Sequence, residues 1–164
     1  MEMLGLDHLY VTVSNFARSE EFYDALMKHF GFRKSDTPIG GEPHAHYFNP
    51  HIQYTIRPAR SGPQPHDPYA PGVHHICFQA PDRASVDEAF RHLQDLGLEP
   101  SPPCEYPEYA PDYYATFFSD PDGIRLEVVA RASVRDEIAR NWGQLTSFLN
   151  PVSRFRERHK PGAA

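Results

Sequence analysis

The sequence predicts an α+β protein made of two tandem β-α-β-β-β modules, followed by a C-terminal helix. Two observations lead to this prediction. A strand pattern, a helix pattern and three further strand patterns occur in this order over residues 5–58 and again over residues 72–130. The proline-rich stretch at 58–72 separates the two copies and is typical of a loop. An internal repeat of this length indicates one structural unit written twice.

The first module starts with LDHLYVTV, residues 6–13, where apolar and polar residues alternate as in a half-buried strand. Apolar residues at helical spacing follow, and they predict a helix that Ser14 or Asn15 caps and Gly31 ends. Three shorter strands are then expected around residues 33–36, 45–49 and 51–58. This order predicts one β-α-β-β-β module.

The second module repeats the order. GVHHICFQA, residues 72–80, predicts a strand, and residues 84–97 predict an amphipathic helix. The buried stripe of this helix is expected to contain Val86, Ala89, Phe90, Leu93 and Leu96. Strands are expected near residues 98–106, in YYATFFSD and in IRLEVVA. The turn DPDG before the last strand matches the NPHI segment of the first module, which supports the repeat.

Residues 1–132 are expected to form one domain, with a helix and a basic tail in residues 133–164. The candidate buried positions of that helix are Val134, Ile138, Trp142, Leu145 and Leu149. This apolar surface, together with the exposed edges of short sheets, predicts a homodimer.

Composition excludes several classes of function. The chain has 164 residues and a net charge of -6, which gives no electrostatic reason to expect a nucleic-acid partner. It has neither an apolar stretch long enough to cross a membrane nor a secretory signal pattern. We therefore expect no membrane partner. The two cysteines indicate no disulfide framework, so we expect a cytoplasmic protein.

Three residues carry the most informative pattern: His8, His75 and Glu127, each inside a short alternating segment. Both histidines occupy the equivalent place in the first strand of their module. If the two sheets curl around a central cleft, alternation directs all three side chains into it. Two imidazoles and one carboxylate hold a divalent metal and leave positions open for a substrate, so the sequence predicts a metal-binding cleft. The donor set does not choose among Fe²⁺, Mn²⁺, Ni²⁺, Co²⁺ and Zn²⁺.

Other residues are weaker candidates. His44 and His46 form an H-x-H pair, an alternative chelate that lacks an evident third partner. The candidate substrate-binding residues are Tyr10, Gln53, Thr55, Arg57, Gln79 and Arg125. Tyr113 and Tyr114 precede a strand and are candidates either for the cleft mouth or for ordinary packing. No catalytic residue can be named.

The segments LDHLYVTVSNFARSEEFY, GVHHICFQAPD and FFSDPDGIRLEVV resemble the signatures of the vicinal oxygen chelate superfamily. This superfamily includes glyoxalase I, extradiol dioxygenases, fosfomycin-resistance thiol transferases and bleomycin-resistance proteins. The resemblance covers about residues 5–130. It implies two β-α-β-β-β modules around a divalent metal, whose ligands fall on His8, His75 and Glu127.

The chain departs from glyoxalase I at one position. Matching IQYTIR to IRLEVV places Thr55 where a further carboxylate is expected, and a threonine is no general base near neutral pH. The resemblance therefore implies a metal-dependent enzyme acting on a small oxygen-bearing molecule by dioxygenation, thiol addition or lyase/isomerase chemistry. The alternative is a non-catalytic binding or resistance protein of the same fold. Retention of all three metal donors favours the enzyme.

Overall fold

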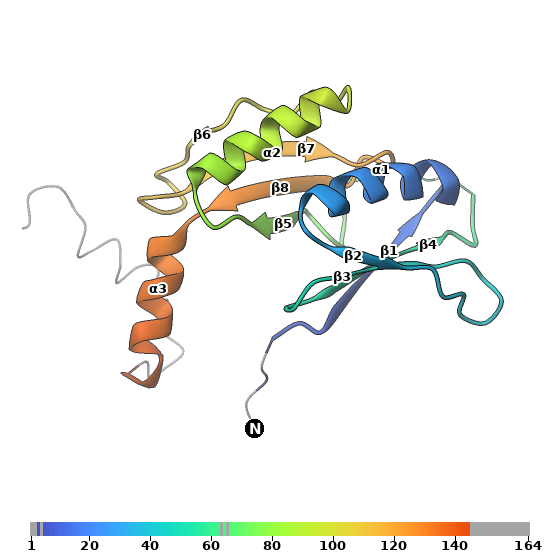
Figure 1. Ribbon diagram of the computed structural model, residues 1–164, viewed down its shortest axis with the longest axis horizontal. Coiled ribbons are helices and arrows are strands. Elements are labelled where there is room, and N and C mark those ends of the chain that lie inside the picture. Colours follow the sequence, from blue (N-terminus) through green and yellow to red (C-terminus); the bar gives the residue numbers. More distant parts are fainter. Residues whose placement is uncertain (1–2, 4, 63, 65, 145–164) are drawn as a thin grey trace, which may run out of the picture. The chain divides into compact units, whose positions relative to one another are not determined.

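The computed structural model in Figure 1 describes residues 3, 5–62, 64 and 66–144. Its described part contains strands and helices in the predicted order, so the α+β class and the two β-α-β-β-β modules are confirmed. The elements are β1 (His8–Val13), α1 (Phe16–His29), β2 (Arg33–Ser35), β3 (Ala45–Phe48), β4 (Gln53–Pro58), β5 (Ile76–Gln79), α2 (Arg83–Asp95), β6 (Cys104–Glu105), β7 (Tyr114–Ser119), β8 (Arg125–Ala130), α3 (Ala132–Asn141) and the 3₁₀ helix η1 (Trp142–Gln144).

The chain divides into two compact units. The first holds the residues up to 75 together with residues 119–125, and the second holds residues 76–118 with those from 126 onward. Because residues 119–125 belong to the first unit, neither unit is a single continuous stretch of chain.

The sheet of the first unit has the strand order β1-β4-β3-β2, with β1 parallel to β4 and the other neighbours antiparallel. Val11 and Val13 of β1 are buried, whereas Tyr10, which precedes them, is 41% exposed. On β4, the ring of Tyr54 lies 5.2 Å from that of Tyr23 in α1. One face of this sheet therefore packs on α1 (Figure 1), and the opposite face carries the polar side chains that alternation predicts.

Helix α1 is capped by Asn15, one of the two residues predicted for this role. The side chain of Asn15 accepts a hydrogen bond from the backbone N–H of Arg18 at 3.1 Å, which satisfies one of the N–H groups that the first turn leaves without a helical partner. The buried residues of the helix are Ser19, Tyr23, Leu26 and Met27. Gly31 follows the helix with a φ of 78°, a conformation that favours glycine.

The sheet of the second unit has the order β5-β8-β7-β6, with β5 parallel to β8 and β6 antiparallel to β7. Its first strand is shorter than predicted: β5 begins at Ile76, so His75 lies just before the strand and not inside it. The register explains the difference. Ile76 pairs with Leu126, and β8 begins only one residue earlier, so β5 has almost no partner backbone to extend along.

Helix α2 is capped by Asp82, whose carboxylate accepts the backbone N–H of Ser85 at 2.8 Å. The prediction of a buried stripe is confirmed at Val86, Ala89 and Leu93. It is wrong at Leu96, which is 38% exposed because it follows the last helical turn as the C-cap.

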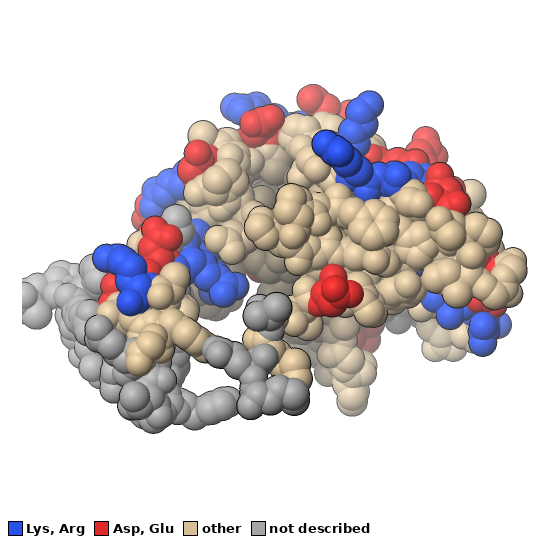
Figure 2. Space-filling view, turned by 60° about the horizontal axis from the view of Figure 1, so that its bottom comes forward, with Lys and Arg blue, Asp and Glu red and all other residues tan. Residues whose placement is uncertain are grey.

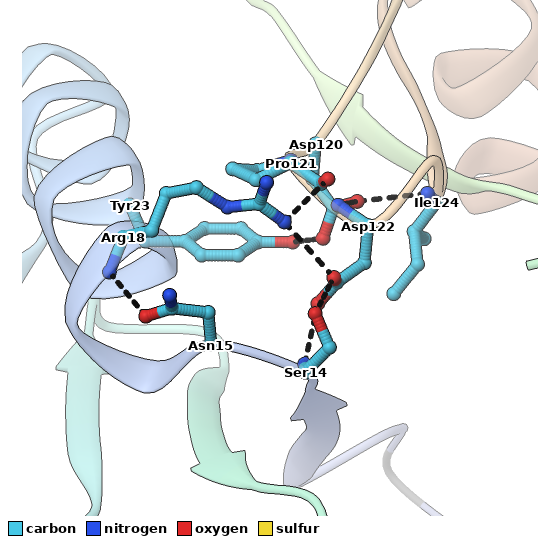
Figure 3. A network of polar contacts seen from close by, with 8 residues as sticks. All are labelled: Ser14, Asn15, Arg18, Tyr23, Asp120, Pro121, Asp122 and Ile124. Carbon is cyan, nitrogen blue, oxygen red and sulfur yellow. Dashed lines mark hydrogen bonds and ion pairs between the residues drawn. The ribbon is translucent and has the colours of Figure 1, made fainter. Parts of the chain in front are cut away.

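The DPDG turn before β8 is built around the buried carboxylate of Asp120 (Figure 3). One of its oxygens accepts the backbone N–H groups of Asp122 and Ile124 at 2.9 and 2.8 Å. The other accepts the Tyr23 hydroxyl at 2.9 Å. That hydroxyl in turn accepts the hydroxyl of Tyr54. The turn is thereby tied to α1 and β4 within the first unit.

The matching turn of the first module uses the same device. The side-chain oxygen of Asn49 accepts the backbone N–H groups of His51 and Ile52 at 2.8 and 2.9 Å. Asn and Asp both make this local side-chain-to-backbone turn. The sequence repeat thus has a physical basis, because in both modules a side-chain oxygen stabilises the turn before the last strand.

The C-terminal helix α3 starts with the backbone N–H of Ser133 donating to Asp112 at 2.9 Å. Ile138 is partly buried, as predicted, and packs against a cluster of the second unit. The prediction that Trp142 is buried is wrong: the residue is 60% exposed, because it follows α3 in η1. The side chains of Val134, Leu145 and Leu149 lie outside the described part of the structure.

No helix among the described residues is both long and apolar enough to cross a membrane. On the face drawn in Figure 2, basic side chains are interspersed with acidic ones.

Candidate metal-binding residues and the polar sheet face

The polar face of the first sheet is organised in rows across three neighbouring strands. Tyr10 of β1 and His46 of β3 both pair with Thr55 of β4, which lies between them. In the next row, Gln53 pairs with both His8 and Phe48. Residues that pair across strands on one face have neighbouring side chains, so this grid brings together several of the residues that the sequence nominated.

A hydrogen-bond chain runs through the centre of this grid. His46 Nε2 lies 3.0 Å from the backbone carbonyl of Thr37, which can only accept, so Nε2 carries the proton. In the neutral ring Nδ1 then accepts, and the Thr55 hydroxyl donates to it at 3.0 Å. The amide of Gln53 donates to the Thr55 oxygen at 2.8 Å. Gln53, Thr55 and His46 thus form one satisfied polar network, with Thr55 fully buried.

This network bears on the alternative H-x-H chelate. His46 uses both ring nitrogens for hydrogen bonds, so neither is available to a metal. His44 stacks on it with ring centroids 5.8 Å apart and directs Nδ1 to the carbonyl of Glu42 at 2.9 Å. Both histidines are buried, and because both ring nitrogens of His46 are occupied, the pair is not arranged as a chelate.

His8 lies at the exposed start of β1. Its Nδ1 contacts the carboxylate of Asp7 at 2.9 Å, and its ring lies edge-on to that of Tyr10 at 5.3 Å. A carboxylate on Nδ1 fixes the tautomer of a histidine and presents Nε2 as the coordinating atom, an arrangement common behind metal-binding histidines. The local geometry of His8 therefore fits the role of a ligand.

His75 has a similar arrangement. Its Nδ1 lies 2.7 Å from Nδ1 of His74, the residue that precedes it, as Asp7 precedes His8. When His75 donates this hydrogen bond, its Nε2 carries a lone pair and suits a metal. The side chain is exposed.

Glu127 belongs to β8 in the second unit and is 1% exposed. The Tyr113 hydroxyl donates to its Oε1 at 2.5 Å. Burial, and next the bond to Glu127, raise the pKa of Tyr113 well above its usual range, so the phenol keeps its proton. A carboxylate in the interior of a protein is costly without strong partners, and the Tyr113 hydroxyl is one such partner of Glu127.

Cys77 pairs with Glu127 across β5 and β8. Desolvation of the sulfur, and next the charge of Glu127, raise the pKa of the Cys77 thiol to about 12. A thiol with this pKa is a poor nucleophile near neutral pH, so Cys77 is best described as a neutral neighbour of the carboxylate.

The candidate substrate-binding residues differ in what holds them. Tyr10 is exposed on the polar face, whereas Gln53 and Thr55 are engaged in the network described above. Arg57 forms an ion pair with Glu42, and its buried Nε has no hydrogen-bond partner. Gln79 is exposed on β5, and Arg125 is half-buried at the start of β8.

The three predicted ligands are divided between the units: His8 and His75 belong to the first, and Glu127 belongs to the second. Within the described chain, no group of three or more His, Cys, Asp or Glu side chains is arranged to hold a metal ion. The metal site therefore stays a prediction from the sequence.

Sequence reasoning missed two features. It left Tyr113 between a packing role and a place at the cleft mouth, and it did not foresee its bond to Glu127. It also did not connect His46 with Thr55. The weak signal for the second was the strand alternation, which places both residues on the polar face once the register is known.

The comparisons with known proteins agree with this fold. The family model described as Glyoxalase/Bleomycin resistance protein/Dioxygenase superfamily matches residues 5–128. No curated protein matches the chain. Among solved structures, the glyoxylase/bleomycin resistance protein/dioxygenase domain from Frankia sp. EAN1pec has a TM-score of 0.67 and 22% identity, covering 79% of this chain and 98% of its own.

Two further structures have more specific names. The lactoylglutathione lyase from Agrobacterium tumefaciens has a TM-score of 0.58 and 17% identity, covering 79% of this chain and 96% of its own. The genomically encoded fosfomycin resistance protein from Listeria monocytogenes has a TM-score of 0.59 and 20% identity, covering 79% of this chain and 95% of its own. At these identities the likeness shows the fold.

Proposed function

We propose, on the premise that this chain belongs to the glyoxalase/bleomycin resistance protein/dioxygenase superfamily, that it is a metal-dependent enzyme acting on a small oxygen-bearing molecule. The metal ligands in this proposal are His8, His75 and Glu127. The observation that carries it is the retention of all three donors, with the two histidines at equivalent positions of the repeat. A protein that only sequesters a ligand has no need of this set.

The surroundings of each ligand support the proposal. Asp7 engages Nδ1 of His8, and His74 engages Nδ1 of His75. The contact with Asp7 favours coordination through Nε2 of His8, and the contact with His74 favours it for His75 when His75 is the donor. When bound, a divalent metal with three protein ligands supplies a positive centre that binds substrate oxygens and stabilises negative charge that develops on them. The ligand set is compatible with Fe²⁺, Mn²⁺, Ni²⁺, Co²⁺ and Zn²⁺.

The polar face of the first sheet is the proposed contact surface for the substrate. Tyr10 and Phe48 are its exposed aromatic side chains, at 41% and 40% exposure, and they suit the apolar part of a small molecule. The orphaned Nε of Arg57 suits an oxygen of the substrate. Thr55 is locked by its hydrogen bonds and supplies neither a carboxylate nor a free hydroxyl proton.

The reaction belongs to one of three classes in this proposal: dioxygenation, thiol addition, or lyase/isomerase chemistry. The structural neighbours with specific names are a lactoylglutathione lyase and a fosfomycin resistance protein, so substrates of both kinds belong in a screen. Because residue 55 is a threonine and not a carboxylate, we favour dioxygenation and thiol addition over isomerisation as the reaction class.

Metal analysis of the purified protein tests the proposal. We expect about one divalent ion per chain, and loss of most of it in His8→Ala, His75→Ala and Glu127→Ala. His51→Ala is the matched control, because this exposed histidine uses only its backbone N–H in a described contact. Full metal content in one of the three variants would remove that residue from the site. A metal-loaded protein that binds a small molecule without turnover would instead be a binding protein.

A further inference from the structure

Tyr113 and Glu127 form a buried pair within the second unit. Tyr113 lies directly before β7 and is 9% exposed, whereas Glu127 lies in β8 and is 1% exposed. The phenol hydroxyl donates to Oε1 of the carboxylate. The guanidinium carbon of Arg131 lies 5.7 Å from the centre of the phenol ring. The phenol is therefore held by one contact at its hydroxyl and another at its ring.

A carboxylate has two equivalent oxygens and turns about its terminal bond with little resistance. A strong donor on one oxygen fixes that rotation and distinguishes the two atoms. We infer that Tyr113 is a positioning residue, whose hydroxyl holds the Glu127 carboxylate in the orientation in which it would bind the metal. This inference rests on the proposed function, in which Glu127 is a metal ligand. Partners of this kind behind a ligand commonly affect metal affinity about 10- to 100-fold when removed.

The competing explanation is that Tyr113 only fills the interior. Its ring does pack in a cluster with Ala110, Ala115 and Val129, and it lies 5.2 Å from the ring of Tyr109. Packing depends on the ring, however, and positioning depends on the hydroxyl. Tyr113→Phe removes the hydroxyl and keeps the ring, so it separates the two roles.

The chain offers a matched control in the next residue. The hydroxyl of Tyr114 donates to the carboxylate of Asp87 in α2 at 2.8 Å. Tyr114→Phe therefore also deletes one tyrosine–carboxylate hydrogen bond of the second unit. Asp87 is no proposed ligand, so this deletion should leave the metal site intact.

The experiment titrates metal-free protein with Co²⁺ by calorimetry and records the visible absorption of the bound ion, which reports its coordination geometry. Four proteins are compared: native, Tyr113→Phe, Tyr114→Phe and Glu127→Gln. We expect Tyr113→Phe to bind Co²⁺ about tenfold more weakly or worse, with a changed absorption spectrum. Tyr114→Phe should match the native protein, and Glu127→Gln should lose most of its affinity.

Each other outcome overturns a specific statement. Equal affinity and spectra in the two Phe variants would refute the positioning role and leave the proposed function standing. The positioning role is refuted in the same way if Tyr113→Phe lowers only the thermal stability of the metal-free protein. Native affinity in Glu127→Gln would remove Glu127 as a ligand, and with it the role of Tyr113. A native protein that binds no Co²⁺ and no other divalent ion would overturn the proposed function itself.

Discussion

Ser14 and Asp122 are 108 positions apart in the sequence, and the side chain of Asp122 accepts both the backbone N–H of Ser14, at 2.8 Å, and its hydroxyl. Arg18 adds a third donor to the same carboxylate at 3.2 Å and also donates to the carbonyl of Pro121 (Figure 3). The turn before β8 is thus fastened to the point where β1 ends and α1 begins. This relationship holds the first unit together across two distant segments of chain.

Asp122→Ala should destabilise the protein. It removes the acceptor of three donors at once, and we expect a loss of about 1–3 kcal/mol in the free energy of unfolding. Urea unfolding measures the change. Glu21→Ala is the control, because this exposed side chain of α1 has no described hydrogen bond, and its effect should stay within about 0.5 kcal/mol. Equal effects of the two substitutions would show that the turn is not fastened through Asp122.

Asp120 should give the stability a recognisable dependence on pH. Burial raises the pKa of its carboxyl above the ordinary 3.8. The folded state therefore holds the proton more tightly than the unfolded chain. The stability gained by protonation is present below the unfolded pKa and is lost as the pH rises through the folded pKa.

The variant Asp120→Asn isolates this effect, because its amide oxygen can still accept the backbone N–H groups and does not titrate. We expect the stability of the variant relative to the native protein to improve from about pH 4 to pH 7. Urea unfolding across this range measures the difference, in which the other carboxyl groups largely cancel. A difference that stays constant with pH would contradict the raised pKa.

Thr55→Val should destabilise the polar network on the first sheet. The isosteric change removes both hydrogen bonds of the buried Thr55 hydroxyl and leaves only the longer contact of 3.3 Å between the Gln53 amide and Nδ1 of His46, at a cost of about 1–3 kcal/mol. Thr12→Val is the control, because this exposed residue of β1 makes no described side-chain hydrogen bond. If Thr12→Val lowers the free energy of unfolding as much as Thr55→Val does, the effect arises from placing valine in this sheet and not from loss of the network.

The threonine at position 55 also predicts that the native protein lacks one activity, hemithioacetal isomerisation. With no carboxylate at Thr55, we expect no appreciable isomerisation of a hemithioacetal by the metal-loaded protein. Thr55→Glu should tighten metal binding by adding a donor and should impair the native reaction by closing a coordination position. Robust isomerisation by the native protein, measured by the absorbance of the thioester product, would show that another group acts as the base.

A homodimer stays a prediction, in which the exposed Trp142 of η1 would contribute apolar surface to the contact. Light scattering after gel filtration should give twice the mass of the chain at micromolar concentration. Deleting residues 133–164 should lower that mass to the monomer value if the helix packs on the partner. A monomeric native protein would contradict the prediction outright.

The sequence was sufficient for features that depend on local periodicity. Strand alternation predicted which face of β1 carries His8 and Tyr10, and the asparagine before α1 predicted its cap. The two matching turns predicted the repeat, because Asn49 and Asp120 act through backbone groups only a few residues away. Local chemistry is visible in a sequence because its partners are neighbours.

Features that depend on register or on tertiary packing could not be predicted. The bond between His46 and Thr55 requires the pairing of β3 with β4, and the bond between Tyr113 and Glu127 joins residues on two sides of a turn. The errors at Leu96 and Trp142 have one cause: the apolar pattern continues beyond the point where the helix ends.

The assignment of residues 119–125 to the first unit has a consequence for dissection of the protein. A cut between residues 75 and 76 would not release two self-sufficient halves. The N-terminal fragment would lose Asp120 and Asp122, so the Tyr23 hydroxyl and the start of α1 would have no acceptor from the turn. A fragment-complementation experiment or a module exchange with a relative must therefore keep residues 119–125 together with the N-terminal module.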